Sequence, residues 1–426
     1  MTSDRKRLTN IVGGSAGNLV EWFDWYVYAA FALYFAPSFF PKGDQTAQLL
    51  STAAVFAAGF VMRPIGAWLF GIYADRKGRK AGLTLSVSLM CAGSLIIAAA
   101  PTYAQAGVWS PALLVVARMI QGLSLGGEYG SSATYLSEMA GKERRGFWSS
   151  FQYVTLIAGQ LTALFLLLGL QALLGEEALT AWGWRIGFAV GALLAIVVFV
   201  IRRNLTETPS FAAAKPARDS GRTSSGRRLF REHPREALLV MGLTAGGTLA
   251  FYAYTTYMQK YLANTVGFDK VTASWIMTVA LTLFIILQPL AGLLSDRIGR
   301  KPVMIAFGVA GMVLTVPIFT ALESVRDPLT AFALVMTSLV IVTGYTSINA
   351  VVKAELFPGH IRALGVALPF AIANTLFGGT AEYVALWLKG AGHERWFYYY
   401  VAGMIGLSLI TYVTMRETKT TSLIEE

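Results

Sequence analysis

The sequence has almost no cysteine or histidine. Cys91 is its only cysteine, and its three histidines, His233, His360 and His393, are scattered along the chain. A single cysteine cannot form an intrachain disulfide or a cysteine metal cluster. Motifs such as GxSxG, HExxH and the Walker phosphate loop are also missing from the sequence. We therefore expect neither an enzyme nor a redox protein, and no cofactor and no metal.

Charge is scarce as well. Charged residues make up 14% of the 426 residues and hydrophobic residues 55%, whereas about a quarter of an ordinary soluble protein is charged. Runs of some 20 apolar residues, long enough to cross a bilayer, recur along the whole chain. Twelve spans are predicted at 12–35, 50–74, 81–101, 112–135, 146–171, 183–203, 237–258, 271–294, 302–322, 329–352, 362–388 and 396–415.

The net charge of +11 follows the predicted membrane topology. With the N-terminus placed inside, most Lys and Arg residues lie in cytoplasmic segments, as the positive-inside rule requires. The charge then needs no nucleic-acid partner, and both termini are expected in the cytoplasm. The apolar segment after MTSDRKRLTN is too long for a signal peptide, so we interpret it as the first membrane helix.

Two signals occur once in each half of the chain. GIYADRKGRK (Gly71–Lys80) returns as GLLSDRIGRK (Gly292–Lys301), and a Glu followed seven residues later by Arg occurs in 138–145 and in 355–362. A repeat at half the chain length indicates two related halves. The predicted domains are a six-helix bundle at 1–203, a basic cytoplasmic linker at 204–236 and a second six-helix bundle at 237–426. The linker either binds anionic lipid headgroups or is only a solvated connection.

The repeated charges predict a latch. Arg and Asp side chains at a helix end form charge-assisted hydrogen bonds with a neighbouring helix terminus, and such bonds can break and reform. We expect each loop to pair with the Glu-to-Arg junction of its own half; the alternative is surface charge that only sets topology. The gating candidates are Gly71, Asp75, Arg76, Arg79, Glu138, Arg145, Gly292, Asp296, Arg297, Arg300, Glu355 and Arg362.

Ionisable residues inside the spans are candidates for function because they are costly in a membrane. Glu21, Asp24 and Tyr28 share one face of the first predicted helix, which should look into the bundle. Arg63 lies twelve residues before Asp75, roughly 18 Å along a helix and close to the bilayer midplane.

The paired loops resemble the signature of the major facilitator superfamily, and the Glu-to-Arg junctions resemble those of its sugar porters. NLVEWFDWYVY, FAAGFVMRPIGAWLFG, RMIQGLSLGGEYG and AELFPGHIRALGV are similar to segments of its metabolite:proton symporters. The resemblance covers essentially the whole chain. It implies an all-α integral membrane protein, with twelve transmembrane helices in two pseudo-symmetric six-helix bundles that expose a central site alternately to the two sides.

The resemblance also implies proton-coupled import of a small dicarboxylate across the bacterial inner membrane. The leading substrate is α-ketoglutarate; succinate, malate, citrate, shikimate or a zwitterionic osmolyte are alternatives. Asp24 and Arg118 are then the acid and base whose pairing changes with protonation, although Glu21 or Glu128 could carry the proton instead. The expected partners are the organic anion, protons and the bilayer, with a monomer as the assembly.

A dicarboxylate needs positive charge at mid-depth. The planar fork of Arg63 suits one carboxylate, and Arg118 either supplies the second contact or is occupied by Asp24. Lys353 is either a further cation or reaches the interface. The candidates for substrate binding are Tyr28, Arg63, Arg118, Gln152, Tyr153, Tyr254, Tyr257, Tyr345, Asn349, Lys353 and Asn374.

Overall fold

The structure is a computed structural model. It describes residues 3–41, 43–77, 79–127, 129, 133–134, 136–137, 140–203, 226–358 and 361–424, without the side chains of residues 3–17, 71–72, 74–77, 79–84 and 201–203. Within those ranges the regular structure is entirely helical. The predicted all-α fold class is therefore confirmed.

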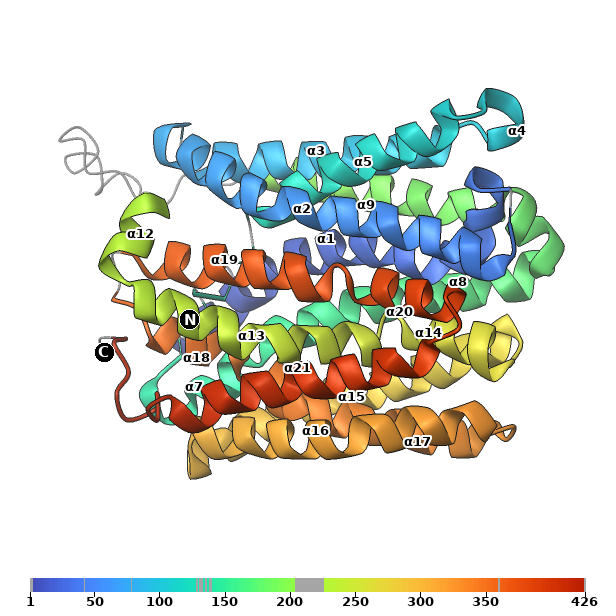
Figure 1. The fold of residues 1–426 in the computed structure, drawn as a ribbon. Helices are drawn as coiled ribbons and strands as arrows, with labels where there is room; N and C mark the ends of the chain where they lie inside the picture. Colours follow the sequence, from blue (N-terminus) through green and yellow to red (C-terminus); the bar gives the residue numbers. More distant parts are fainter. Residues whose placement is uncertain are drawn as a thin grey trace.

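The helices fall into a first half up to α9 and a second half from α12 onward (Figure 1). The first half contains α1 (Ser3–Phe39), α2 (Gln45–Lys77), α3 (Arg79–Ala99), α4 (Tyr103–Ala106), α5 (Trp109–Gly126), the 3₁₀ turn η1 (Lys142–Arg144), α7 (Arg145–Ser149), α8 (Phe151–Ala178), the π turn η2 (Leu179–Gly183) and α9 (Trp184–Arg203). The second half contains α12 (Gly226–Glu232), α13 (Pro234–Tyr254), α14 (Met258–Tyr261), the π turn η3 (Leu262–Val266), α15 (Lys270–Ile298), α16 (Arg300–Ser324), α17 (Pro328–Thr346), α18 (Asn349–Glu355), α19 (Arg362–Ala373), the π turn η4 (Asn374–Gly378), α20 (Ala381–Gly390) and α21 (Glu394–Thr414).

Eight helical stretches of the described chain are long and apolar enough to cross a membrane. One of them, 142–200, contains two of the predicted spans, so the eight account for nine. The remaining three predictions lie along α1, α3 and α5. The predicted linker 204–236 contains α12 and the start of α13, and its residues 204–225 are outside the described part.

Each half packs mainly on itself. In the first half, α1 contacts α8, α2 contacts α5, and α3 contacts both α5 and α9. In the second half, α13 and α16 contact α21, while α15 and α16 contact α17. The two halves meet along α8 and α15 and again where α2 contacts α19 and α20. The space between these two seams is where a central site would lie.

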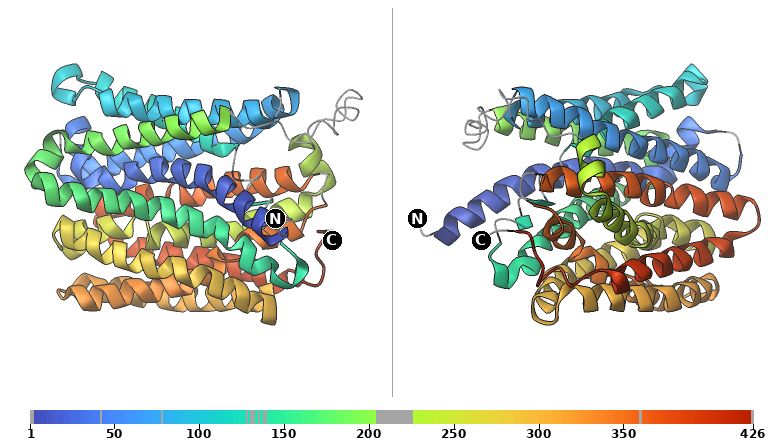
Figure 2. Two further views of the ribbon diagram at one scale, coloured as in Figure 1. Left: turned by 180° about the vertical axis from the view of Figure 1, so that it is seen from behind. Right: turned by 60° about the vertical axis from the view of Figure 1, so that its left-hand side comes forward.

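Both termini lie at one end of the molecule, near α7, α12 and α18 (Figures 1 and 2). We call this the terminal end, and the opposite end, where α4 lies, the far end. At the terminal end the halves touch backbone to backbone: a Cβ on Gly292 of α15 would lie 2.6 Å from the carbonyl oxygen of Gly146 in α7.

Three spans of the second half are interrupted part-way, one of them at 347–348 between α17 and α18. A turn at 255–257 separates α13 from α14, and the π turn η4 with residues 379–380 separates α19 from α20. Interrupted helices in transporters place their binding sites at the break. Here the breaks at 255–257 and 379–380 each divide a span into a part toward the terminal end and a part toward the far end.

Candidate functional site

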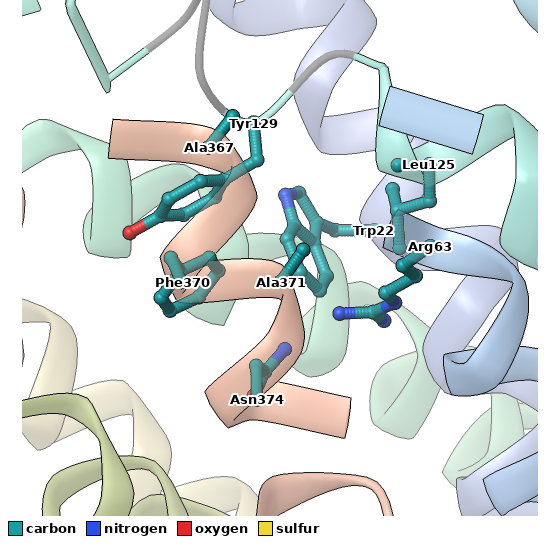
Figure 3. Close-up of a pocket in the computed structure, with 9 residues that line it drawn as sticks. Trp22, Arg63, Leu125, Tyr129, Ala367, Phe370, Ala371 and Asn374 are labelled. Carbon is teal, nitrogen blue, oxygen red and sulfur yellow. The ribbon is translucent and has the colours of Figure 1, made fainter. Parts of the chain in front are cut away.

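A small pocket lies between the halves at the η4 break (Figure 3). The first half contributes side chains from α1, α2 and α5, and the second half contributes them from α19 and η4. The lining residues are Trp22, Arg63, Leu125, Gly126, Tyr129, Ala367, Phe370, Ala371 and Asn374. Figure 3 shows the Arg63 guanidinium pointing from α2 into the space in front of Asn374. Two of the predicted binding residues, Arg63 and Asn374, therefore meet at this pocket.

Arg63 is buried among aromatic rings. Its Cζ lies 3.9 Å from the ring centre of Phe60, 4.2 Å from that of Trp25 and 5.4 Å from that of Trp22. Its Nε and one Nη have no hydrogen-bond partner among the described residues, and no described carboxylate lies within ion-pair distance of it. The ring faces stabilise the cation and leave the donors on these two nitrogens available. Arg63 can therefore receive an anion in the pocket.

Arg118 is a second buried cation of the first half. Its guanidinium lies 3.8 Å from the ring centre of Trp25 and 4.4 Å from that of Tyr28, and it donates to Gln121 Oε1 at 2.8 Å. Its Nε and other Nη have no hydrogen-bond partner in the described part of the chain. Arg118 and Arg63 are near enough to repel one another electrostatically. An anion between α2, which carries Arg63, and α5, which carries Arg118, would reduce that repulsion.

Asp24, the acid expected to pair with Arg118, is connected to it only through another side chain. Asp24 accepts hydrogen bonds from the Ser94 hydroxyl and, at 3.0 Å, from Gln121 Nε2. Gln121 thus bridges Asp24 and Arg118, and the described side chains include no direct ion pair between these two. The direct pairing expected from the sequence is replaced by a relay, because the amide of Gln121 can donate to the acid while it accepts from the base.

The Asp24 carboxyl group is enclosed within the first half. It is completely buried, and a Cβ on Gly191 of α9 would lie 2.1 Å from its Oδ1, so α9 covers it closely. Its hydrogen-bond partners in the described part of the chain are neutral donors from α3 and α5. A carboxyl group in such surroundings can take up a proton without leaving a direct cationic partner unpaired. Of the other acid candidates, Glu21 is buried on α1, and Glu128 lies outside the described residues.

Lys353 of α18 is buried rather than extended to the interface. Its Nζ donates to Asn349 Oδ1 at 2.8 Å and lies 3.8 Å from the ring centre of Phe370. Phe370 stacks on Tyr129 at 3.9 Å, and both line the pocket. Asn349 also accepts from the Tyr129 hydroxyl at 3.3 Å. Lys353 and Asn349 therefore lie directly behind Phe370 and Tyr129, two aromatic residues that line the pocket.

Other predicted binding residues on α1 and α8 are near the cations. Tyr28 presents its ring to Arg118, while its hydroxyl donates to the carbonyl of Thr52 at 2.9 Å. Tyr153 is buried on α8, packs on Phe251 and interacts electrostatically with Arg63. Gln152, beside it, is completely buried.

Two of the three predicted tyrosines of the second half point elsewhere. The Tyr254 hydroxyl bonds to Thr315 of α16 at 2.5 Å, and Tyr257 packs on Tyr261 and Phe397. Tyr345 packs on Phe307, its ring centre lies 6.0 Å from Lys353 Nζ, and its hydroxyl has no hydrogen-bond partner among the described residues. The rings of Tyr254 and Tyr257 fill the second half's own core, where a buried tyrosine contributes apolar packing. The sequence shows that they are tyrosines but not which neighbour they face.

The latch residues of the second half pair within that half, as Arg300 does with Glu355, and they also bind the first half, which the sequence did not predict. Asp296 accepts from the backbone N–H groups of Gly146 and Phe147 at 2.8 and 2.9 Å, and from Arg300 at 2.7 Å. Glu355 lies 3.7 Å from Arg300 and 3.9 Å from Arg145. We call Arg145, Asp296, Arg300 and Glu355 the terminal network. It ties α7 to α15 and α18 across the two halves.

The C-terminal tail is bonded to the terminal network. Thr418 donates to Glu355 at 2.6 Å, Arg145 donates to Ser422 at 3.2 Å, and Glu417 caps the start of α16. Of the remaining gating candidates, Arg362 donates to the carbonyl of Leu423, and Arg297 is exposed. The predictions for Gly71, Asp75, Arg76, Arg79 and Glu138 fall outside the described side chains.

The sequence reasoning missed two features of the site. One is the set of aromatic rings around the two arginines, which the segment WFDWY (22–26) on the same span as Asp24 could have suggested. The other is a buried ion pair, Lys260 with Glu382, at 2.7 Å. Glu382 lies inside a predicted span and Lys260 two residues beyond one. Lys260 and Glu382 could be recognised in the sequence as charges that are costly in or near a membrane. That they pair with each other could be seen only from the fold.

Comparison with known proteins agrees with this architecture. The family model described as "Sugar (and other) transporter" matches twice, over residues 10–227 and 217–426. The alpha-ketoglutarate permease of Escherichia coli (strain K12) is 55% identical over 400 residues, which cover 94% of this chain and 91% of that protein. The citrate-proton symporter of Salmonella typhi is 34% identical over 86% of this chain and 83% of its own length.

A solved structure extends the likeness to the fold. The proton:xylose symporter XylE, of the major facilitator superfamily, superposes with a TM-score of 0.76 at 20% identity, with 97% of each chain covered. At that identity the likeness shows the fold alone. Together with the family match, it shows that this chain is a multi-pass membrane transporter with the major facilitator fold and belongs to the sugar (and other) transporter family.

Proposed function

We propose that this protein is a symporter that imports a small dicarboxylate, α-ketoglutarate first among them, together with protons. The observation that carries the proposal is a set of three buried cations: Arg63 lines the pocket, Arg118 shares the Trp25 ring with it, and Lys353 lies behind Phe370. None of them has a carboxylate in ion-pair contact among the described residues. Charges buried without counterions are costly, so an anionic ligand is the natural partner of this cluster.

The net charge of these three cations favours some of the relatives' substrates over others. Proline/betaine transporters, such as that of Salmonella typhimurium at 31% identity, are named for zwitterions. A zwitterion brings no net charge to three cations, whereas a dianion neutralises two of them. The 55% identity to an alpha-ketoglutarate permease supports the dicarboxylate over the tricarboxylate citrate.

Asp24 is the leading proton site in this proposal. Its relay through Gln121 connects it to Arg118, so a change in protonation at Asp24 alters how Gln121 orients toward the cation. Substrate bound at Arg118 and a proton bound at Asp24 would then favour one another. Alternating access follows from the fold, with the terminal network broken whenever the halves separate at that end.

We place the protein in the bacterial inner membrane, with the terminal end and both termini in the cytoplasm. Lys and Arg concentrate in the segments that the topology puts there, as the positive-inside rule requires. A monomer is sufficient, because one chain encloses the pocket. The domain division at 1–203, 204–236 and 237–426 belongs to the same proposal.

The test is α-ketoglutarate binding to purified, monodisperse protein. Arg63→Lys keeps the charge but removes the planar fork, and a charged hydrogen bond is worth about 1.5–3 kcal/mol, so affinity should fall roughly ten- to a hundredfold. Arg326→Lys, at an exposed loop arginine, is the matched control and should bind like the parent. Unchanged affinity in well-folded Arg63→Lys would remove Arg63 from the site.

Substrate class is tested separately by competition in proteoliposomes. Unlabelled succinate, malate, citrate and betaine are added against labelled α-ketoglutarate, with a proton gradient applied. The proposal expects dicarboxylates to compete and betaine to leave uptake unchanged. Strong competition by betaine with none by dicarboxylates would overturn it.

A further inference from the structure

A buried ion pair in the second half does not line the pocket described above. Lys260 Nζ lies 2.7 Å from Glu382 Oε2, and the side chains are only 1% and 5% exposed. The pair joins α14 to α20, which lie side by side toward the far end (Figure 1). Glu382 is the only hydrogen-bond partner of Lys260 within the described chain.

The pair sits directly beyond two of the helix breaks, those at 255–257 and 379–380. Lys260 follows the turn at 255–257 by three residues, and Glu382 follows the break at 379–380 by two. Each charge is therefore on a short helix that is no longer continuous with the rest of its span. Such segments can shift relative to the bundle at lower cost than an unbroken helix, and transporters bind their substrates at these breaks.

Short contacts connect the pair to the cations of the first half. A Cβ on Gly379, one turn before Glu382, would lie 2.4 Å from the ring of Phe60, and that ring lies 3.9 Å from Arg63. Glu382 also lies within electrostatic range of Tyr28, the ring of the first half that covers Arg118.

A purely structural role explains the pair poorly. Two charges taken out of water recover little net stability from their attraction, and an apolar pair of similar size often serves as well. The Glu382 carboxylate is also chemically the same group that a dicarboxylate presents. An ammonium group carries three N–H donors, and Glu382 takes one of those of Lys260.

We propose that Lys260 binds one carboxylate of the transported anion and that Glu382 occupies Lys260 when the transporter is empty. This inference rests on the proposed function and adds a cation from the second half to the arginines of the first. The substrate carboxylate replaces that of Glu382, and Glu382 takes up a proton from the far-end solution, which keeps the buried charge balanced. The other titratable groups beside Glu382 are Tyr28 on α1 and Tyr257 on α14.

Three variants test the exchange by α-ketoglutarate binding to purified, monodisperse protein at several pH values. Lys260→Gln should weaken binding about ten- to a hundredfold. Glu382→Gln imitates the protonated acid, so it should bind at least as tightly as the parent and with a flatter dependence on pH. The double variant should remain as weak as Lys260→Gln, because removing the competitor cannot replace the lost cation.

A structural pair predicts a different pattern. Either single change would lower the folded yield, and the double variant, with no unpaired buried charge, would recover both yield and parental affinity; that recovery would overturn the inference. The double variant also serves where Lys260→Gln does not fold. Glu323→Gln, which breaks the more exposed pair with Arg395, is the matched control and should change neither affinity nor pH dependence.

The parent protein separates the two proposals. If it binds no dicarboxylate, the proposed function fails, and this inference fails with it. If the parent binds α-ketoglutarate and Arg63→Lys weakens it, while well-folded Lys260→Gln binds normally, the proposed function stands and the role of Lys260 alone is rejected.

Discussion

Arg63 and Arg118 of the first half are stabilised by aromatic rings rather than by acids. Arg63 and Arg118 share the indole of Trp25, at 4.2 and 3.8 Å. A ring face stabilises a cation without forming a counterion that a substrate must later displace. These sites are consequently ready for an anion, whereas Lys260 must first release Glu382. A transporter must also release its substrate. The cost of separating Lys260 from Glu382 lowers the net affinity for the anion and so favours release.

Replacing Asp24 with Asn tests proton coupling at the residue scale. The amide imitates the protonated acid and keeps its size, so we expect uphill uptake driven by a proton gradient to disappear. Exchange of internal for external substrate needs no net proton movement and should persist. The measurement is a comparison of gradient-driven uptake with counterflow in the same proteoliposomes.

Asp327→Asn is the control for this substitution. It makes the same change at an exposed helix cap far from the site and should preserve both kinds of transport. If Asp24→Asn still accumulates substrate with an unchanged dependence on external pH, Asp24 does not carry the proton. Glu21 and Glu128 would then be the next acids to replace.

At the scale of the helices, the entry to α15 is fixed by one cap. The Asp269 carboxylate accepts from the backbone N–H groups of Val271 and Thr272 at 3.0 and 2.9 Å. The hydrogen bonds from Thr272, above all that of its side chain, hold the pKa of Asp269 below its ordinary value of 3.8. The cap therefore contributes stability above about pH 4 and loses it as the pH falls through the lowered folded-state pKa.

Asp269→Ala removes this cap. A lost cap costs about 1 kcal/mol, so amide hydrogen exchange in the first turn of α15 should become about fivefold faster at neutral pH. Asp269→Asn keeps a capping oxygen and should exchange like the parent. Equal exchange in the alanine variant would show that packing, rather than the cap, holds this end of the helix.

The helices themselves were largely predictable, whereas their interruptions were less so. The apolar runs that predicted 271–294 and 302–322 coincide with α15 and α16, because bilayer thickness fixes the length of a span. The break at 255–257 has no comparable signal in local composition, whereas Gly378 and Gly379 could have suggested the break at 379–380. The depth of Arg63 in the membrane followed from its distance along α2. The aromatic rings around it could not be predicted, because they depend on contacts between α1 and α2. Similarly, Gln121 could be recognised as polar, while its place between Asp24 and Arg118 depends on three helices meeting.

For the whole molecule, closure at the terminal end depends on backbone contact between the halves. Gly292→Ala would place a methyl group 2.6 Å from the carbonyl oxygen of Gly146, a clash that side-chain motion cannot relieve. We expect the two halves to be held apart there, with slower transport and greater reactivity of cysteines introduced at the pocket toward reagents from the terminal side. Uptake and labelling are measured on the same membranes.

Gly169→Ala on α8 is the matched control, because a Cβ there meets nothing within 4 Å. It should transport and label like the parent. Normal transport and labelling in Gly292→Ala would show that the halves close without this close approach.

The C-terminal tail has a consequence for how the protein is handled. Residues 417–423 hydrogen-bond to Glu355, Arg145 and the start of α16, so the last part of the chain is a component of the closed terminal end. An affinity tag or fluorescent protein fused there would pull on the same bonds that hold the halves together. Fusions of this kind would bias the conformational equilibrium in every transport assay, and an N-terminal tag is the better choice for purification.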